Sequence, residues 1–123
     1  MTARLAAIVI GIVFVLVGLL GFVNNPVLGL FQVNPLHNLI HIISGIVLLA
    51  GAFSSLGSSM ALKIIGVVYA LVAILGFFAV KADGMLLGLI PVNPADQWLH
   101  VVLAIVILVA AFGLPDDDRA MAM

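Results

Sequence analysis

The chain contains no cysteine and very little charge. Without cysteine it can form no disulfide, thiolate metal site or cysteine nucleophile. Charged residues make up 7% of its 123 residues, against about 25% in soluble domains. The net charge of −1 gives no case for nucleic-acid binding, which needs clustered lysine and arginine, and we expect no nucleic-acid partner. Hydrophobic residues make up 66%, more than a short chain can hide from water, so the surplus must face lipid.

Motifs for catalysis are also missing. No serine lies near a histidine and an acid in the pattern of a catalytic triad, and no phosphate-binding loop is present. We therefore expect that the protein is not an enzyme.

Four long apolar runs dominate the sequence. Each is close to the ~20 residues that a helix needs to cross the hydrocarbon core, and none alternates as a lipid-facing strand would. We predict an all-α membrane protein, a single domain over residues 1–114 with a short acidic cytoplasmic tail at 115–123. The predicted transmembrane helices cover residues 4–23, 35–53, 62–80 and 95–114.

An internal repeat organises these runs. Residues 33–41 return at 92–100 as Val-Asn-Pro, a polar turn and a histidine, and the match continues without a gap at an offset of 59 residues. We predict repeat 1 over residues 4–53 and repeat 2 over 62–112. Because each repeat has two spans, both insert the same way up, as parallel helical hairpins about a pseudo-twofold axis along the membrane normal.

Polar side chains gather at the start of the second and fourth runs. Asn34 and Asn93 suit the N-cap position, each followed by a proline at the first helical position. His41 and His100 lie about 9 Å deeper, at 1.5 Å per residue. They share a helix face with small residues, so we expect them to point into the bundle or toward a neighbouring subunit.

These histidines allow several kinds of site. With His37 and Asp96, each four residues upstream on the same helix face, His41 and His100 could provide a ligand set for zinc. His41 and His100 alone could bind a haem between facing helices, or one of them a chlorophyll-type pigment. Alternatively, the histidines belong to a structural polar network that sets helix register. The network's further members are Asn34, Asn38, Asn93 and Gln97.

The few basic residues predict the orientation. Four spans place both termini on one side, together with Arg4, Lys63 and Arg119, and leave Lys81 alone on the other. The positive-inside rule therefore places both termini in the cytoplasm.

The sequence also resembles a known family. The resemblance rests on Gly18-Leu19-Leu20-Gly21-Phe22, Gly29-Leu30-Phe31, His37-Asn38-Leu39-Ile40-His41 with Gly45, Gly66-Val67-Val68-Tyr69 and Asp96-Gln97-Trp98-Leu99-His100. These motifs are similar to the DUF4383-like family, small bacterial four-helix membrane proteins described as a domain of unknown function. The resemblance implies four spans and a multi-pass protein of the prokaryotic cytoplasmic (inner) membrane, and it brings no established activity.

Two functional hypotheses follow. The first is an accessory or scaffolding subunit, embedded in the bilayer and associated with other membrane-protein subunits or with itself, because small-residue faces for helix packing are plentiful. The alternative is an electron- or energy-transfer subunit that binds haem, a chlorophyll-type pigment or a metal through its intramembrane histidines.

Overall fold

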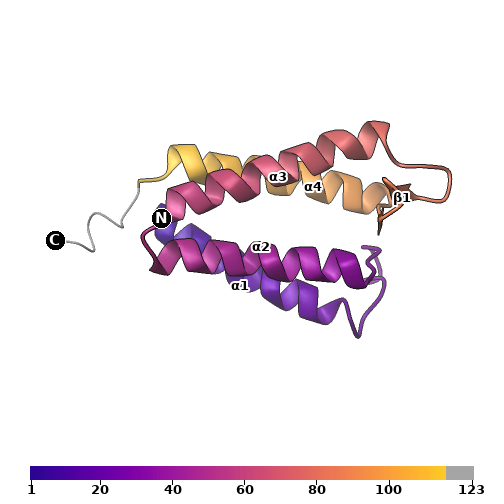
Figure 1. The fold of residues 1–123 in the computed structure, drawn as a ribbon, viewed down its shortest axis with the longest axis horizontal. Helices are drawn as coiled ribbons and strands as arrows, with labels where there is room; N and C mark the ends of the chain where they lie inside the picture. The colour runs from indigo at the N-terminus through magenta and orange to yellow at the C-terminus, as the bar shows by residue number, and fades with distance from the viewer. Residues whose placement is uncertain (116–123) are drawn as a thin grey trace.

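The computed structural model describes residues 1–115, which form four helices and a small hairpin (Figure 1). Each helix is long and apolar enough to cross a membrane, so the predicted fold class is confirmed and the chain is a multi-pass membrane protein by this criterion. The predicted acidic tail, apart from Pro115, lies outside the described residues. The elements are α1 (Ala3–Leu20), α2 (Pro35–Phe53), α3 (Ser58–Phe78), β1 (Met85–Leu86), β2 (Ile90–Pro91) and α4 (Pro94–Gly113).

The helices pair as two hairpins. α1 packs mainly on α2 and α3 mainly on α4, while α2 and α3 join the hairpins. Figure 1 shows the N-terminus, the turn between α2 and α3 and the end of α4 together at one end of the bundle, here called the terminal end. The first loop (residues 21–34) and the third loop (residues 79–93) lie at the other end, here called the loop end.

Small residues set the close packing within each hairpin. A Cβ on Gly11 of α1 would lie 3.0 Å from the Gly45 carbonyl oxygen of α2. A Cβ on Gly66 of α3 would lie 2.6 Å from a methyl of Leu108 on α4. Helices in lipid gain no hydrophobic attraction for one another, so this close approach is what holds each pair together.

Most predicted helix boundaries lie within two residues of the observed ones, and two differ by three or four residues. α3 begins at Ser58 rather than at residue 62, because Gly57, with a φ of 89°, completes the turn within four residues and the following serines enter the helix. α1 ends at Leu20 rather than at residue 23, where turns lead into the first loop. The hairpin of β1 and β2 in the third loop was not predicted.

Both loops contain the same tight turn. Leu28-Gly29 and Leu87-Gly88 have positive φ at both central residues, 54° and 73° in the first loop and 53° and 70° in the third. The Leu30 N–H donates to the Val27 carbonyl at 3.0 Å, and the Leu89 N–H to the Leu86 carbonyl at 2.9 Å. These are the dihedrals of a type I′ turn, which favours Asn-Gly. Leucine is a poor residue for its first position.

Replacing Leu87 by asparagine should therefore stabilise the protein. Asparagine tolerates the left-handed conformation that leucine adopts at a cost of about 1 kcal/mol or more, so we expect the free energy of unfolding to rise by about 0.5–1 kcal/mol. Denaturant unfolding in detergent micelles would measure the change. Leu87→Ala removes the same exposed side chain but keeps the strain, and an equal gain in that variant would contradict the explanation.

The two hairpins exchange hydrogen bonds at the loop end. Asn34 Nδ2 donates to the Leu89 carbonyl at 2.9 Å, and Asn93 Nδ2 donates to the Leu30 carbonyl at 2.8 Å. Reciprocal contacts of this kind arise between units related by a twofold axis. The duplication of the hairpin stays a prediction. Two copies of one hairpin related by a twofold axis would make reciprocal hydrogen bonds such as these.

Replacing Asn34 by aspartate isolates this cross-hairpin bond. Asn34 Oδ1 accepts from the His37 N–H at 2.8 Å, and aspartate keeps that cap while removing the Nδ2 donor. We expect unfolding free energy to fall by about 1 kcal/mol, and Asn34→Ala to cost about 1 kcal/mol more through loss of the cap. Denaturant unfolding would measure both losses. No loss in Asn34→Asp would show that only the cap matters, and equal losses in the two variants would show that the cap contributes nothing.

Candidate metal centre

The starts of α2 and α4 position the histidines. Asn34 caps α2 at His37, and Asn93 caps α4 by accepting from the Asp96 N–H at 2.8 Å. A proline at the first turn fixes each start further. The register of both helices is therefore set from the loop end, and with it the depth of His41 and His100.

His37, His41 and His100 converge inside the bundle. One ring nitrogen of each lies within 4.8 Å of the other two. The His37 ring centroid is 4.7 Å from that of His41 and 5.8 Å from that of His100. The three residues are only 2%, 5% and 2% exposed. The backbones of α2 and α4 make few close approaches, so these side chains span the gap between them.

Aromatic rings close the site on its deeper side. Tyr69 stacks on His41 with centroids 6.4 Å apart and planes inclined by 8°, and it meets His100 edge-on at 6.0 Å. Phe14 packs against both Tyr69 and His41, at 5.2 and 5.9 Å. The imidazoles therefore sit in a water-excluding, largely apolar surround.

The imidazoles carry unused hydrogen-bonding groups. Among the described residues, Nδ1 of His37, of His41 and of His100 is buried with no hydrogen-bond partner. An unpaired buried polar atom costs about 1–3 kcal/mol, so three in one cluster need a physical explanation. A shared ligand that accepts electron pairs from imidazole nitrogens would supply one.

Asp96 does not join this group. Its Oδ2 accepts from the Asn93 N–H at 3.0 Å, which completes a capping box, and from the Gln32 N–H of the first loop at 3.2 Å. The zinc set predicted from sequence thus comes together for its three histidines, while the carboxylate is held at the start of α4. The Asn-x-x-Asp spacing of a capping box was the signal for this second role.

The remaining network residues have separate tasks. Asn34 and Asn93 cap helices and link the hairpins, as described above, and Gln97 Nε2 donates to the Ala73 carbonyl at 2.7 Å. Among the described residues, Asn38 Oδ1 and Gln97 Oε1 have no hydrogen-bond partner. Asn38 Oδ1 occupies the space that a Cβ on Gly21 would fill, and Gln97 Oε1 the space that a Cβ on Gly76 would fill. These glycines leave room for the amides next to the histidine site.

Sequence reasoning missed two residues beside the site. Ser44 Oγ lies 3.2 Å from the Tyr69 hydroxyl and donates to the Ile40 carbonyl at 2.7 Å, so the tyrosine supplies the proton of the shared bond. Ser44 follows His41 by three residues, a spacing that shares a helix face. Gln32 contacts the His37 ring through its backbone, and no sequence pattern marks it.

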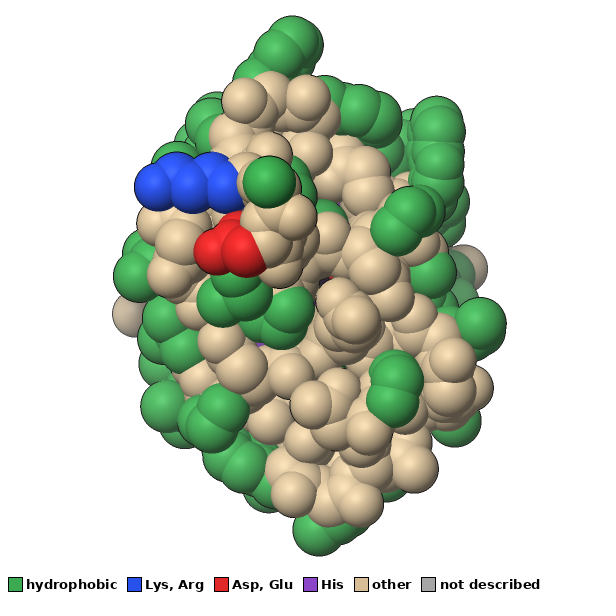
Figure 2. Space-filling view, turned by 90° about the vertical axis from the view of Figure 1, so that its right-hand side faces the viewer, with side chains coloured by type: hydrophobic (Ala, Val, Ile, Leu, Met, Phe, Trp, Pro, Cys, Tyr) green, Lys and Arg blue, Asp and Glu red, His purple; other side chains and the backbone are tan. Residues whose placement is uncertain are grey.

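The loop end covers the site from the other side. Figure 2 looks onto this end, where backbone and polar groups occupy the centre, apolar side chains surround them, and the histidines are almost entirely hidden. A basic side chain lies beside an acidic one near the edge of this face. The cluster is thus enclosed rather than open to solvent.

Comparison with known proteins identifies the family. The family model described as Domain of unknown function (DUF4383) matches residues 4–113. The chain belongs to this family. The match covers all four helices and all three clustered histidines, and it confirms the resemblance inferred from the motifs. No curated protein and no solved structure matches this DUF4383 chain.

Proposed function

We propose that this DUF4383 protein binds a single divalent transition-metal ion, with zinc as the leading candidate, at His37, His41 and His100. The observation that carries the proposal is the cluster of three buried histidines, in which one ring nitrogen of each lies within 4.8 Å of the other two and each Nδ1 lacks a hydrogen-bond partner among the described residues. Neutral imidazole is a common ligand of zinc, copper and nickel. An ion held there would use the electron pairs that the described residues leave unpaired.

The spacing of the ligands supports a small ion. Imidazole nitrogens on a tetrahedral zinc lie about 3.3 Å apart, given Zn–N bonds of about 2.0–2.1 Å. The present nitrogens, within 4.8 Å of one another, would need to move by about 1 Å to reach that geometry. Three protein ligands leave a fourth position for water or for a further group.

The same packing favours an ion over the macrocycle of a haem or a chlorophyll-type pigment. A bis-histidine haem would need a flat slot between His41 and His100. The rings of Phe14 and Tyr69 instead pack directly against the imidazoles, at centroid distances of 5.9–6.4 Å. Binding a macrocycle would require the aromatic surround to open.

The proposed setting is the cytoplasmic membrane of a bacterium, with both termini in the cytoplasm. The described cations support this orientation. Arg4 and Lys63 lie at the terminal end, where they cover the rings of Phe53 and Phe112 at 4.9 and 5.0 Å, and Lys81 lies in the third loop. In this setting the protein acts as a metal-binding subunit and not as an enzyme.

Zinc titration of the purified protein tests the proposal. Protein stripped with a chelator in mild detergent should bind one Zn²⁺ per chain by calorimetry, and metal analysis after desalting should find the same ratio. Co²⁺ in place of zinc should give the absorption bands of a tetrahedral site. A protein that stays metal-free and whose unfolding temperature ignores Zn²⁺ would overturn the proposal.

A role as an accessory or scaffolding subunit is favoured by a separate feature. α1 and α4 pack loosely, and an apolar groove of about 330 Å³ runs between them. The alanines Ala6 and Ala110 line it, which suits the close approach of a transmembrane helix from another subunit. Gentle extraction should then yield a complex of fixed stoichiometry, and recovery of a lone monomer would count against this role.

A further inference from the structure

The histidine cluster lies much closer to one end of the bundle than to the other. His41 is about 9 Å from the start of α2 and about 18 Å from its last residue, Phe53, at 1.5 Å per residue. The loop end is therefore the shorter way to bulk water for anything that reaches the imidazoles.

The way toward the terminal end is closed by apolar side chains. Beyond the pair formed by Ser44 and Tyr69 the core contains Leu48, Leu62 and Ile107, each 0% exposed. Moving a bare ion through such a region carries a desolvation cost of tens of kcal/mol. An ion cannot reach the cluster from this side.

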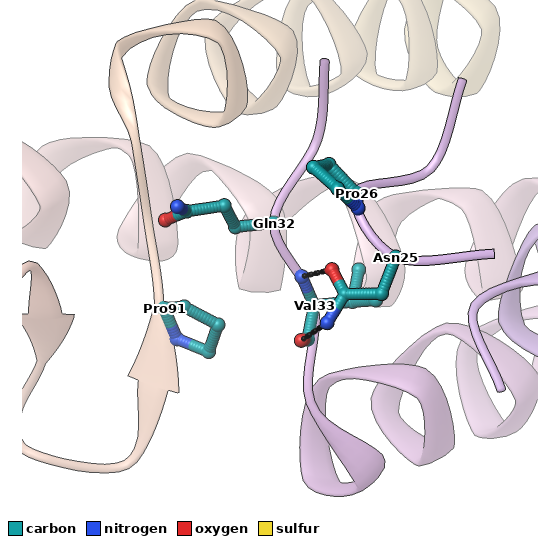
Figure 3. A pocket seen from close by; sticks show the side chains of 5 residues that line it. All are labelled: Asn25, Pro26, Gln32, Val33 and Pro91. Atoms are coloured by element: carbon teal, nitrogen blue, oxygen red, sulfur yellow. Dashed lines mark hydrogen bonds between the residues drawn. The ribbon is translucent and has the colours of Figure 1, made fainter. Parts of the chain in front are cut away.

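The loop end offers a pocket instead. A cavity of about 330 Å³ lies between the first loop and the segment of β2, and it is lined by Asn25, Pro26, Gln32, Val33 and Pro91. Figure 3 shows Gln32 extending across this space toward Pro91, while Asn25 holds the Val33 backbone through two hydrogen bonds. At about 30 Å³ of liquid volume per water, the pocket has room for an ion with several of its waters.

Gln32 connects this pocket to the site. Its side chain lines the pocket, its backbone contacts the His37 ring, and its N–H donates to Asp96 Oδ2 at 3.2 Å. Asp96 is therefore a carboxylate one hydrogen bond away from the pocket wall and on the same helix face as His100. It is 2% exposed, so bulk water screens its charge only weakly.

We propose that the metal ion reaches the three histidines from the loop end, through the pocket at Gln32, with Asp96 as the carboxylate that draws it in. This inference rests on the proposed metal binding. The protein would then take up the metal ion from the side of the membrane opposite its termini. Asp96 acts while the ion enters, and the three histidines hold the ion once it is bound.

Zinc loading of oriented liposomes tests the direction. The chain has no cysteine, so Ala82→Cys in the exposed part of the third loop reports orientation through a membrane-impermeant maleimide. With Zn²⁺ outside and a chelator inside, molecules whose residue 82 faces outward should load, and those facing inward should stay empty. Equal loading of both populations, or loading of the inward population alone, would overturn the inference. Failure of Zn²⁺ to bind even in detergent would instead overturn the proposed metal site.

Substitution of Asp96 tests the carboxylate. Asp96→Asn keeps an oxygen for the cap but removes the charge, so the Zn²⁺ loading rate should fall by about tenfold or more while saturation stays at one ion per chain. Asp83→Asn is the matched control, because Asp83 is an exposed carboxylate of the same loop end that lies outside the pocket lining. A lost stoichiometry in Asp96→Asn would make Asp96 a resident ligand. An unchanged rate, or equal slowing by both substitutions, would remove its role in passage.

Discussion

Replacing His41 by alanine should lower the affinity of the protein for Zn²⁺ by at least about 100-fold. Loss of a group that merely orients a metal ligand already costs about 10–100-fold, and His41 would be a ligand itself. The loss follows from the position of His41, whose ring lies 4.7 Å from that of His37 and whose Nδ1 has no hydrogen-bond partner among the described residues. Competition titration against a chromophoric chelator would measure the change.

Tyr69→Phe is the control for this prediction. The substitution keeps the ring that stacks on His41 and removes only the hydroxyl bonded to Ser44, so Zn²⁺ affinity should stay within a few-fold of the unmodified protein. In the predicted repeat the first helices of the two halves align at an offset of 55 residues, which pairs Tyr69 with Phe14, so phenylalanine already occupies the corresponding position in the first half. If both variants lost affinity equally, the effect would come from disturbed packing and not from a missing ligand.

Replacing Gly45 by valine should destabilise the protein by about 3 kcal/mol or more, at or above the usual range for overpacked sites. A Cβ at this position would lie 2.5 Å from the Gly11 carbonyl oxygen and 2.9 Å from the Val15 amide nitrogen. Both obstacles belong to the backbone of α1, so no side-chain rotation relieves the clash and the α1–α2 hairpin must open. Thermal unfolding in detergent would show the loss.

Gly113→Val provides the comparison. It adds the same side chain to a helical glycine, but the nearest atom to its Cβ, a methyl of Val109, is 3.9 Å away. We expect a change of less than about 1 kcal/mol there. Because Gly45 is one turn from His41, Gly45→Val should also lower the amount of Zn²⁺ bound at saturation. If Gly45→Val unfolded at a lower temperature yet bound Zn²⁺ normally, the geometry of the histidine site would not depend on the packing of the α1–α2 hairpin.

Much of the architecture was predictable because lipid imposes simple rules. A backbone in hydrocarbon must satisfy its own hydrogen bonds, so four apolar runs of about 20 residues could only be helices. The helix starts at Asn34 and Asn93 followed from cap chemistry, and the inward direction of His41 and His100 followed from the small residues on their faces. The start of α3 could not be read in the same way, because a serine-rich stretch suits both a turn and a first helical turn.

The sequence by itself determined that this chain has four helices able to cross a membrane, where α2 and α4 begin and which of their faces turn inward, since these properties depend on local composition, cap residues and helical period. Only the tertiary structure decided that His37 joins His41 and His100 while Asp96 is held by a cap and by Gln32. Those relations depend on how far apart helices α2 and α4 lie and on where a loop from the other hairpin comes to rest. Distances between segments that are remote in sequence are set by packing, and no period or motif encodes them.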